Sequence, residues 1–343
     1  MPPAEPAFSH LDVPLHLEPM EAKSVAELPT GPGWRYEPKW DGFRCLTFRD
    51  GEAVELRAKS GKSLTRYFPE VVAGLRALPA KRFVLDGELT VAVDGALSFE
   101  ALQMRLHPAE SRIRKLAAET PAALVMFDCL VDATGRSVLD QPLSARHEVL
   151  DGLATKFAGS RVVTLSPGTE SRATASRWLE GVGGDLDGVI AKRLDGPYRP
   201  GERSMLKIKR LRTADCVVGG FRYLADRREV GSLLLGLYDD RGLLDHVGFT
   251  STISDAERPA LTKRLEALSA PPGFTGDAPG GPSRWSTERS AQWTPLRPEL
   301  VVEVRYDHVT GDRFRHGTKL LRWRPDKAPR QCTFDQVRGA VAA

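Results

Sequence analysis

The chain has 343 residues, enough for two domains of ordinary size that each bury their own hydrophobic core. Hydrophobic residues make up 41% of the chain and charged residues 27%, which is typical of a globular protein and excludes a disordered one. The net charge is only +4, but basic residues outnumber acidic ones most clearly between Arg305 and Arg338. A local basic surface of this kind favours a polyanionic partner.

The cysteines and the N-terminus indicate the compartment. The four cysteines are far apart, match no metal-ligand spacing and are expected to be reduced, mostly buried thiols. No apolar run approaches the roughly 18 residues that a membrane helix needs. The opening residues MPPAEPAFSH lack the charged and apolar regions of a signal peptide. We therefore expect a cytoplasmic protein, most simply a monomer, with no membrane partner.

The first half of the chain shows mixed helix and strand patterns. Residues 1–33 are rich in proline and predict little regular structure. From Trp34 onward strands are expected, and Asp50-Gly51 is a strong hairpin signal between two of them. Because tight hairpins exclude a purely parallel sheet, the pattern predicts an α+β domain with antiparallel sheets. The expected strands are 43–48, 53–59, 82–91, 122–131 and 186–194, and the expected helices are 67–78, 99–119, 143–157 and 170–182.

The second half predicts a smaller, mainly β domain. Its expected helix, 254–268, has Ser254 as a plausible N-cap. Residues 269–291 are rich in Pro, Gly and Ser and are expected to form a mobile loop. About five short strands with one inserted helix are typical of an OB-fold β-barrel. The expected strands are 215–224, 231–240, 243–252, 299–309 and 319–325, and we place the domain boundary between residues 211 and 212.

The stretch EPKWDGFRC gives Lys39 unusual neighbours, with Asp41 two positions on and Arg44 five positions on. A turn with a surface lysine is the simple explanation, but such a lysine needs none of this company. A lysine that acts as a nucleophile must give up its proton, since an ammonium group at the ordinary lysine pKa of about 10.4 has no lone pair to offer. Nearby cations and partial burial favour the neutral amine. Lys39 is therefore a candidate nucleophile.

Two further motifs place functional side chains on apolar strands. LDGEL carries Asp86 and Glu88, and acids are costly to bury unless they are paired with a cation, a metal or a hydroxyl donor. A hairpin turn is the alternative explanation for this motif. MFDCL carries Phe127, which by itself is more often a core residue than a stacking surface.

Three more motifs carry charges later in the chain. LDGVIAKR begins a strand with Asp187, and SMLKIKR alternates Lys207 and Lys209 with apolar residues. Period-two alternation puts both lysines on one face of a strand, although a solvated basic face is the common explanation for such a pair. The last motif, RWRPDK, lies at 322–327 near the C-terminus.

In this order the six motifs resemble those of the covalent nucleotidyltransferases, the superfamily of DNA ligases, RNA ligases and mRNA capping enzymes. EPKWDGFRC, SGKSLTRYFPE, LDGEL, GVIAKR and LRWRPDK are most similar to the small bacterial ATP-dependent DNA ligases of the ligase C type and to the ligase domain of ligase D. The resemblance extends from about Leu17 to Lys327. It implies a nucleotidyltransferase (adenylation) domain over 1–211 and an OB-fold domain over 212–343, with DNA clamped between them.

The resemblance also implies an activity, namely ATP-dependent sealing of nicks in duplex DNA during repair. In that family AMP passes from ATP to a lysine, then to the DNA 5′ phosphate, and the 3′ hydroxyl finally displaces it. Lys39 matches the adenylated lysine. ATP as AMP donor and Mg²⁺, or Mn²⁺, are the implied cofactors. Nicked duplex DNA is the implied partner, with repair or end-joining proteins as further ones.

Site residues follow from the same resemblance. Phe127 would stack on adenine, Arg44 and Glu88 would contact the ribose, and Lys207 with Lys209 would face the phosphates, where positive charge stabilises an in-line displacement. The complete implied nucleotide-binding set is Glu37, Lys39, Trp40, Arg44, Lys59, Glu88, Phe127, Lys207 and Lys209.

The resemblance implies a metal site and a step-one motif as well. Glu88 and Asp187 are the implied Mg²⁺ ligands, because this hard cation prefers carboxylate oxygen and water. Asp41 is expected to orient Lys39 or to hold a metal-bound water, with its own charge neutralised by Mg²⁺ or an arginine. On the OB domain, Arg324, Asp326 and Lys327 match residues that orient the leaving pyrophosphate, which implies that this domain moves during the cycle.

Two positions depart from the family pattern. Lys59 stands where arginine is usual, so bidentate phosphate binding is lost. Asp187 stands where glutamate is usual, and its shorter side chain could leave a metal contact mediated by water. An RNA ligase or a capping guanylyltransferase would share Lys39 and the later motifs. A non-catalytic DNA-binding factor with the same fold is the third alternative, against which the intact Lys39, Glu88, Lys207 and Lys209 argue. The repair pathway stays open, as does whether the isolated protein already carries AMP.

Overall fold

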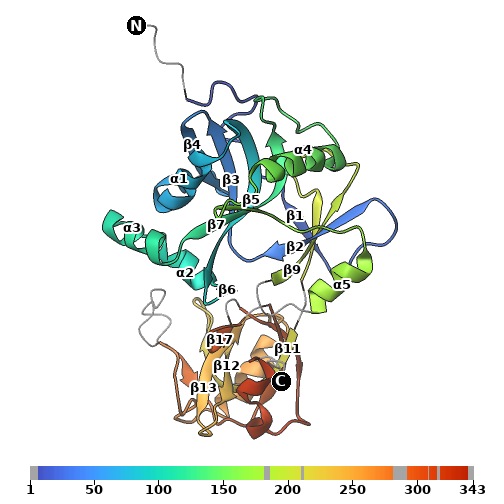
Figure 1. Cartoon of the computed structure of the whole chain (residues 1–343). Coiled ribbons are helices and arrows are strands. Elements are labelled where there is room, and N and C mark those ends of the chain that lie inside the picture. The colour runs from blue at the N-terminus through green and yellow to red at the C-terminus, as the bar shows by residue number, and fades with distance from the viewer. Residues whose placement is uncertain are drawn as a thin grey trace. The chain divides into compact units, whose positions relative to one another are not determined.

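The computed structural model describes residues 7–180, 186–209, 212–280, 292–307, 309–314 and 317–338. The chain divides into two compact units, Met1–Arg210 and Leu211–Ala343, and each is described by itself (Figure 1). Within the described ranges, no helix is long and apolar enough to span a membrane. The four cysteines are free thiols and all are buried, as the sequence predicted.

Two sheets form the first unit. The larger has the order β4(Ala53–Ala58), β3(Phe43–Asp50), β5(Arg82–Val93), β7(Ala122–Val131) and β8(Val163–Leu165), and β6(Ala96–Leu97) pairs with β5. The smaller has the order β1(Ala22–Val25), β10(Met205–Ile208), β9(Leu186–Arg193) and β2(Trp34–Trp40). In these two sheets the parallel pairs are β7 with β8 and β1 with β10, and the other pairs are antiparallel. The prediction of an α+β domain with mainly antiparallel sheets is confirmed.

The hairpin between β3 and β4 forms where the sequence signals it. Asp50 pairs with Ala53, so the loop has two residues, and Gly51 adopts a φ of 60° that only glycine adopts at little cost. β1, in contrast, lies in the region predicted to have little regular structure. Its four residues, AKSV, have no strong strand signal of their own and are held by pairing with β10.

The helices of the first unit are α1(Pro69–Ala77), α2(Phe99–Met104), α3(Glu110–Glu119), α4(Leu143–Lys156) and α5(Arg172–Glu180), and a short 3₁₀ helix covers Thr65–Tyr67. The single helix predicted over 99–119 is two helices. Pro108 lies between them and disfavours a continuous helix, because it lacks an N–H group and clashes with the preceding turn. The Ser98 side chain caps α2 by accepting a hydrogen bond from the Ala101 N–H at 3.1 Å.

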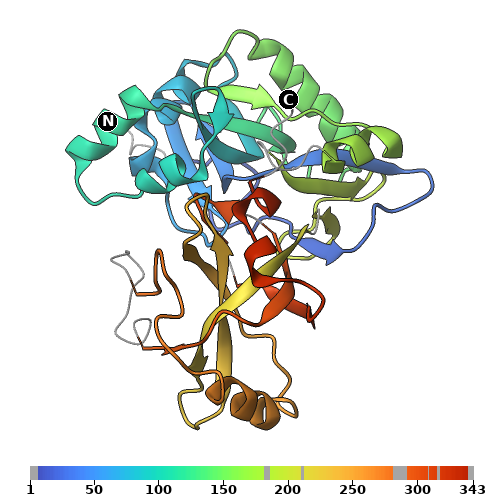
Figure 2. The ribbon, with the colours of Figure 1, turned by 90° about the horizontal axis from the view of Figure 1, so that it is seen from below.

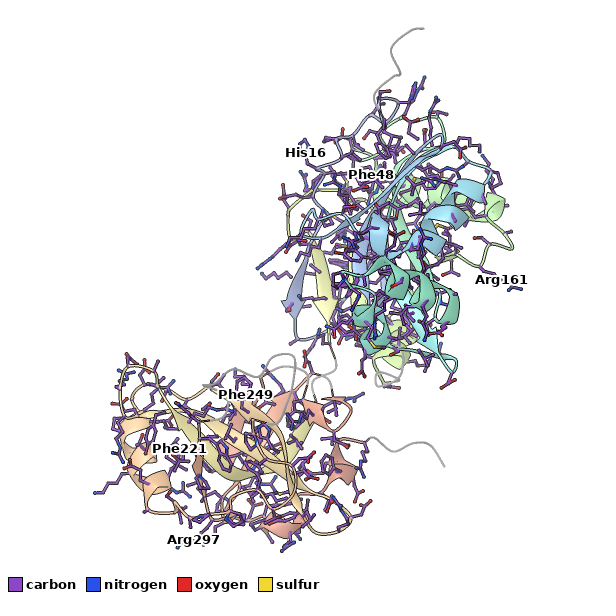
Figure 3. The ribbon with its side chains drawn as sticks, turned by 90° about the vertical axis from the view of Figure 1, so that its left-hand side faces the viewer. His16, Phe48, Arg161, Phe221, Phe249 and Arg297 are labelled. Atoms are coloured by element: carbon purple, nitrogen blue, oxygen red, sulfur yellow. The ribbon has the colours of Figure 1, made fainter. Side chains whose placement is uncertain are left out.

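The two sheets of the first unit pack against each other through one apolar cluster. Phe48 of β3, Val84 of β5 and Met205 of β10 belong to it and are buried, and Figure 3 labels Phe48. A second cluster fills the other face of the large sheet beneath α1 and α4. A third lies between the small sheet and α5 (Figure 1). Burial of this apolar surface from water is the main stabilising contribution.

The second unit contains an antiparallel sheet of β13(Leu244–Thr250), β12(Val230–Tyr238), β11(Arg212–Tyr223), β15(Val301–Tyr306) and β18(Lys319–Trp323), in that order. β14(Thr294–Pro295) pairs with β11, and β16(Val309–Thr310) pairs with β17(Arg313–Phe314). Two 3₁₀ helices, Pro329–Gln331 and Phe334–Gln336, follow β18. α6(Arg258–Glu266) packs beside β12 (Figure 2), and Phe221 of β11 is fully buried in the core (Figure 3).

The five main strands of this sheet and α6 follow one another as predicted for an OB fold, with three of these strands before the helix and two after it. The outer strands β13 and β18 are linked at one point, where the Thr318 N–H donates to the Phe249 carbonyl at 3.0 Å and the Thr250 hydroxyl donates to the Thr318 carbonyl at 2.9 Å. The described residues show this single bridge between the outer strands and no closed barrel.

The predicted start of the helix in the second unit is wrong. α6 begins at Arg258 with Glu257 as its N-cap, and the Ser254 hydroxyl instead donates to Glu257 Oε2 at 2.6 Å. Pro259 explains the later start, since its ring fits the first turn of a helix but would clash inside a helix that began at Ser254. Of the loop predicted over 269–291, residues 281–291 lie outside the described ranges, and residues 269–280 contain no helix.

Candidate active site

The first unit contains a cavity of about 600 Å³ beside the end of β2. Its wall includes residues 19–24, parts of β9 and β10, and eight of the predicted nucleotide-binding residues. Gly188 lets β9 pass close to β10 here, because its φ is 145° and an added Cβ would collide with the Ile208 carbonyl oxygen. The predicted residues that line the cavity are Glu37, Lys39, Trp40, Arg44, Lys59, Glu88, Phe127 and Lys207.

Lys39 lies opposite Gly188 at the end of β2 and forms an ion pair with Asp187. Its Nζ is 2.5 Å from Asp187 Oδ2, and the Nζ of Lys209 is 2.9 Å from the same oxygen. Burial alone would raise the pKa of Asp187, but the two lysines lower it below its usual value. Asp187, a predicted metal ligand, is therefore an ionised carboxylate shared by the side chains of two lysines.

Glu37 is buried and surrounded by cations. Its carboxylate is 2.7 Å from the Nζ of Lys192, 3.3 Å from the Nε2 of His147 and 3.3 Å from the Nε of Arg35. Burial opposes ionisation, but Lys192 and His147 outweigh it and lower the pKa of Glu37 to about 2. The sequence reasoning gave Lys192 no role, although a lysine at the end of the apolar run VIAK was a usable signal.

Phe127 has two cations close to its ring. The Arg44 guanidinium lies 4.7 Å from the ring centroid, and the Lys192 Nζ lies 4.6 Å from it. Arg44 is in turn held by Asp86, with nitrogen to oxygen distances of 2.5 and 2.6 Å. Tyr198 donates its hydroxyl to the same carboxylate at 2.6 Å. Asp86 was noted in its motif but given no role, and Tyr198 was missed.

The remaining predicted residues lie as follows. The Trp40 indole N–H donates to the Ser166 hydroxyl at 2.9 Å. Lys207 makes no ion pair with a described residue, and its pKa is lowered by burial and by the nearby Lys39, Lys209, Lys59 and Arg203. Asp41 follows β2 and does not line the cavity, so its role stays a prediction.

Glu88 differs from the other acids of the cavity because no side-chain cation pairs with it directly within the described residues. The Gly42 N–H donates to its Oε1 at 3.2 Å. Burial raises the pKa of Glu88 to about 7, although Arg44 and Lys39 partly oppose the shift. A half-buried carboxylate of this kind would be stabilised by a bound cation.

The raised pKa of Glu88 leads to a prediction about stability. When a carboxyl group has a higher pKa in the folded than in the unfolded chain, its ionisation lowers the free energy of unfolding. For Glu88 this loss takes place as the pH rises from about 4.5 to about 7. The change in the free energy of unfolding that Glu88→Gln causes should therefore be more favourable at pH 8 than at pH 4.5, by roughly 1–3 kcal/mol. Urea unfolding at several pH values measures this, with exposed Glu18→Gln as the control. A gain that does not depend on pH would contradict the prediction.

The carboxylates of Glu88 and Asp187 are oxygen ligands of the kind that a magnesium ion prefers. Mg²⁺ in nucleotide enzymes commonly takes one or two carboxylates together with water and substrate phosphates. Among the described residues, no group of three or more His, Cys, Asp or Glu side chains could hold a metal ion. A protein-only metal cage is therefore not present in this part of the chain, and a cation here would depend on the phosphates of a substrate.

The predicted step-one motif lies in the second unit, just after β18. The Nη1 of Arg324 is 2.8 Å from Asp215 Oδ1, and Nη2 is 2.8 Å from Asp326 Oδ2. The Nζ of Lys327 is 3.4 Å from Asp215 Oδ2. The hydrogen bond from Arg324 lowers the pKa of Asp326 to about 2. Asp215, a buried residue of β11 that the sequence reasoning missed, thus holds both cations of the motif together.

Comparison with known proteins covers both units. The model of the ATP dependent DNA ligase domain matches residues 19–209, and that of the ATP dependent DNA ligase C terminal region matches residues 226–327. The chain is 46% identical over 345 residues to DNA ligase C1 of Mycolicibacterium smegmatis, a match that covers 95% of this chain and 96% of that protein. It is 45% identical to DNA ligase C of Mycobacterium tuberculosis, covering 94% and 93%.

Solved structures agree at the level of the fold. A Lig E DNA ligase has a TM-score of 0.55 at 18% sequence identity, covering 90% of this chain and all of that one. At this identity the likeness concerns the fold alone.

Proposed function

Because the chain belongs to the family of ATP-dependent DNA ligases, we propose that it seals nicks in duplex DNA through an AMP adduct on Lys39 and then through adenylated DNA, in DNA repair. The observation that carries the proposal is the cavity of the first unit. It brings Lys39 together with an aromatic surface, Phe127, and with an unpaired cation, Lys207, among the described residues. A nucleophile, a surface for adenine and a positive charge for the phosphates are what adenylyl transfer from ATP requires.

In the first step the Nζ of Lys39 would attack the α-phosphorus of ATP. The neutral amine of Lys39 forms a nitrogen–phosphorus bond, the bond to pyrophosphate breaks, and the bonded nitrogen releases a proton. Asp187, whose Oδ2 is 2.5 Å from Nζ, is the group within reach to accept this proton or pass it to water. Lys207 supplies positive charge for the phosphates, and Phe127 offers its ring to adenine.

In the later steps the adenylyl group leaves Lys39 for the DNA 5′ phosphate, and the 3′ hydroxyl then displaces AMP to form the phosphodiester bond. Mg²⁺, with Glu88 and Asp187 as its carboxylate donors, would neutralise phosphate charge when bound. Arg44 stays fixed during these steps, because Asp86 accepts hydrogen bonds from two nitrogens of its guanidinium. The cation that Arg44 places beside the Phe127 ring is therefore preorganised.

The proposal is tested by measuring the intact mass of the protein and by assaying the sealing of nicked duplexes. The purified protein is incubated with Mg²⁺ and either ATP or GTP, and its intact mass is measured. We expect a gain of one AMP from ATP and none from GTP, which would separate ligation from capping chemistry. Sealing of nicked duplex DNA but not of nicked duplex RNA would separate a DNA ligase from an RNA ligase. A protein that forms no adduct and seals neither substrate would contradict the proposal.

The remaining expectations extend this function. We propose a cytoplasmic monomer with nicked duplex DNA as its partner, and repair or end-joining proteins as further partners. Whether the isolated protein already carries AMP on Lys39 is read from the same intact-mass measurement, before ATP is added.

DNA binding should depend steeply on salt. Neutralised phosphates release counterions, so the logarithm of the binding constant should fall linearly with the logarithm of the salt concentration. With about six phosphate contacts, affinity for a nicked duplex should fall on the order of a thousandfold between 50 and 200 mM KCl. Fluorescence anisotropy in EDTA, which prevents sealing, measures this. A nearly flat response would contradict binding through the phosphate backbone.

A further inference from the structure

The wall segment Pro19–Ser24 brings an acid into the nucleotide cavity. Its backbone is fixed at Glu21, because the Glu21 N–H donates to the Glu202 carbonyl at 2.7 Å and the Met205 N–H donates to the Glu21 carbonyl at 3.1 Å. The next residue, Ala22, begins β1 and pairs with Met205. The side chain of Glu21 therefore starts from a rigid position on the cavity wall.

The Glu21 carboxylate lies between two cations that line the same cavity. Its Oε1 is 2.8 Å from the Nζ of Lys59, and its Oε2 is 3.4 Å from the Nε of Arg203. The hydrogen bond and charge of Lys59, assisted by Arg203, lower the pKa of Glu21, so the carboxylate is ionised at neutral pH. Lys59 and Arg203 also act on Lys207, whose pKa they help to lower. The three cations thus form one basic region of the cavity, and Glu21 is the anion within it.

We propose that Glu21 is an internal competitor of polyphosphate binding, which occupies the anion position between Lys59 and Arg203 until a polyphosphate displaces it. The proposal rests on the adenylyl-transfer function proposed above and deepens it. A carboxylate and a phosphate offer the same kind of oxygen to a lysine or an arginine, so the two compete for one position.

The effect of this competition depends on the number of phosphates in the ligand. A pyrophosphate group carries several charged oxygens and can contact both cations at once, which replaces both ion pairs of Glu21. A single phosphate that lies beside Lys39 leaves Glu21 in place and gains nothing from Lys59 or Arg203. Glu21 therefore weakens the binding of a pyrophosphate group and leaves the binding of a single phosphate unchanged. After AMP transfer, the return of Glu21 to the two cations favours release of pyrophosphate.

The experiment measures anion binding directly. Full-length protein is freed of AMP with excess pyrophosphate and desalted, and inorganic pyrophosphate and AMP are titrated into it by calorimetry at low salt. Because the two ion pairs are partly exposed, Glu21→Gln should tighten pyrophosphate binding about three- to tenfold. AMP binding should change less than about twofold. Glu18→Gln, which removes the same charge from an exposed side chain outside the cavity, should alter neither.

A second variant tests whether the gain in pyrophosphate binding depends on Lys59. Lys59→Met in the Glu21→Gln background should remove most of the gain, and thermal melting checks that each variant is folded. Unchanged or weaker pyrophosphate binding by Glu21→Gln would overturn the proposal, because Glu21 would then only orient the two cations. An equal gain for AMP would overturn it too. The titration needs no turnover, so its failure is distinguishable from the absence of an AMP adduct in the intact mass.

Discussion

Replacement of Lys39 by alanine should abolish the AMP adduct and lower nick sealing with ATP by at least about 10⁴-fold, because the covalent step loses its nucleophile. The structure argues against another lysine of the site acting as the nucleophile in place of Lys39. Lys192, another lysine of the cavity, is held by Glu37 at 2.7 Å, and Lys209 is held by Asp187 at 2.9 Å. Asp187 keeps Lys209 as its partner in the variant, so we expect the fold to persist.

Two further substitutions separate the role of Lys39 as a nucleophile from the effect of its positive charge. Lys39→Arg keeps a cation beside Asp187, but a guanidinium is not deprotonated near neutral pH and should form no adduct either. Lys62→Ala removes an exposed lysine and should adenylate normally. Intact mass after incubation with ATP gives the adduct, and a gel assay gives sealing. Both Lys39 variants should retain some sealing of a pre-adenylated nick. Persistence of the adduct in Lys39→Ala would refute the assignment of the nucleophile.

Local sequence signals were sufficient for much of the fold. The hairpin at Asp50-Gly51 and the apolar strand 122–131 follow from turn chemistry and from a continuous buried run. β1 was missed, because AKSV becomes a strand only through pairing with β10, which lies about 180 positions away in the chain. The break at Pro108 and the late start of α6 at Arg258 had local causes in two prolines that periodicity alone did not weigh.

The site shows a different limit. Family resemblance named eight of the residues that line the cavity, but it did not name the side chains that hold them. Arg44 and Asp86 are 42 positions apart, and Arg324 and Asp215 are 109 positions apart. No spacing rule within one strand or helix links such residues, because the sheet registers bring them together. Asp86 and Asp215 became interpretable only from the distances in the structure.

Lys327→Ala should impair adenylation of the protein by about 10²-fold or more and should affect sealing of a pre-adenylated nick far less. The family resemblance predicts that Lys327 orients the pyrophosphate that leaves in the first step, and loss of one preorganised charge at a phosphate typically costs about this much. The variant should stay folded, since Lys327 makes one long ion pair of 3.4 Å to Asp215, and Arg324 still holds Asp215 at 2.8 Å.

Two assays on the same preparation separate the steps. Single-turnover formation of the AMP adduct follows step one, and sealing of a nick that already carries AMP on its 5′ phosphate follows the last step. Lys319→Ala, an exposed lysine of β18, is the matched control and should adenylate at the normal rate. A group needed only in step one must leave the site before DNA is joined, so a selective loss supports a second unit that moves during the cycle. Equal losses in both assays would show that Lys327 serves one fixed arrangement of the enzyme.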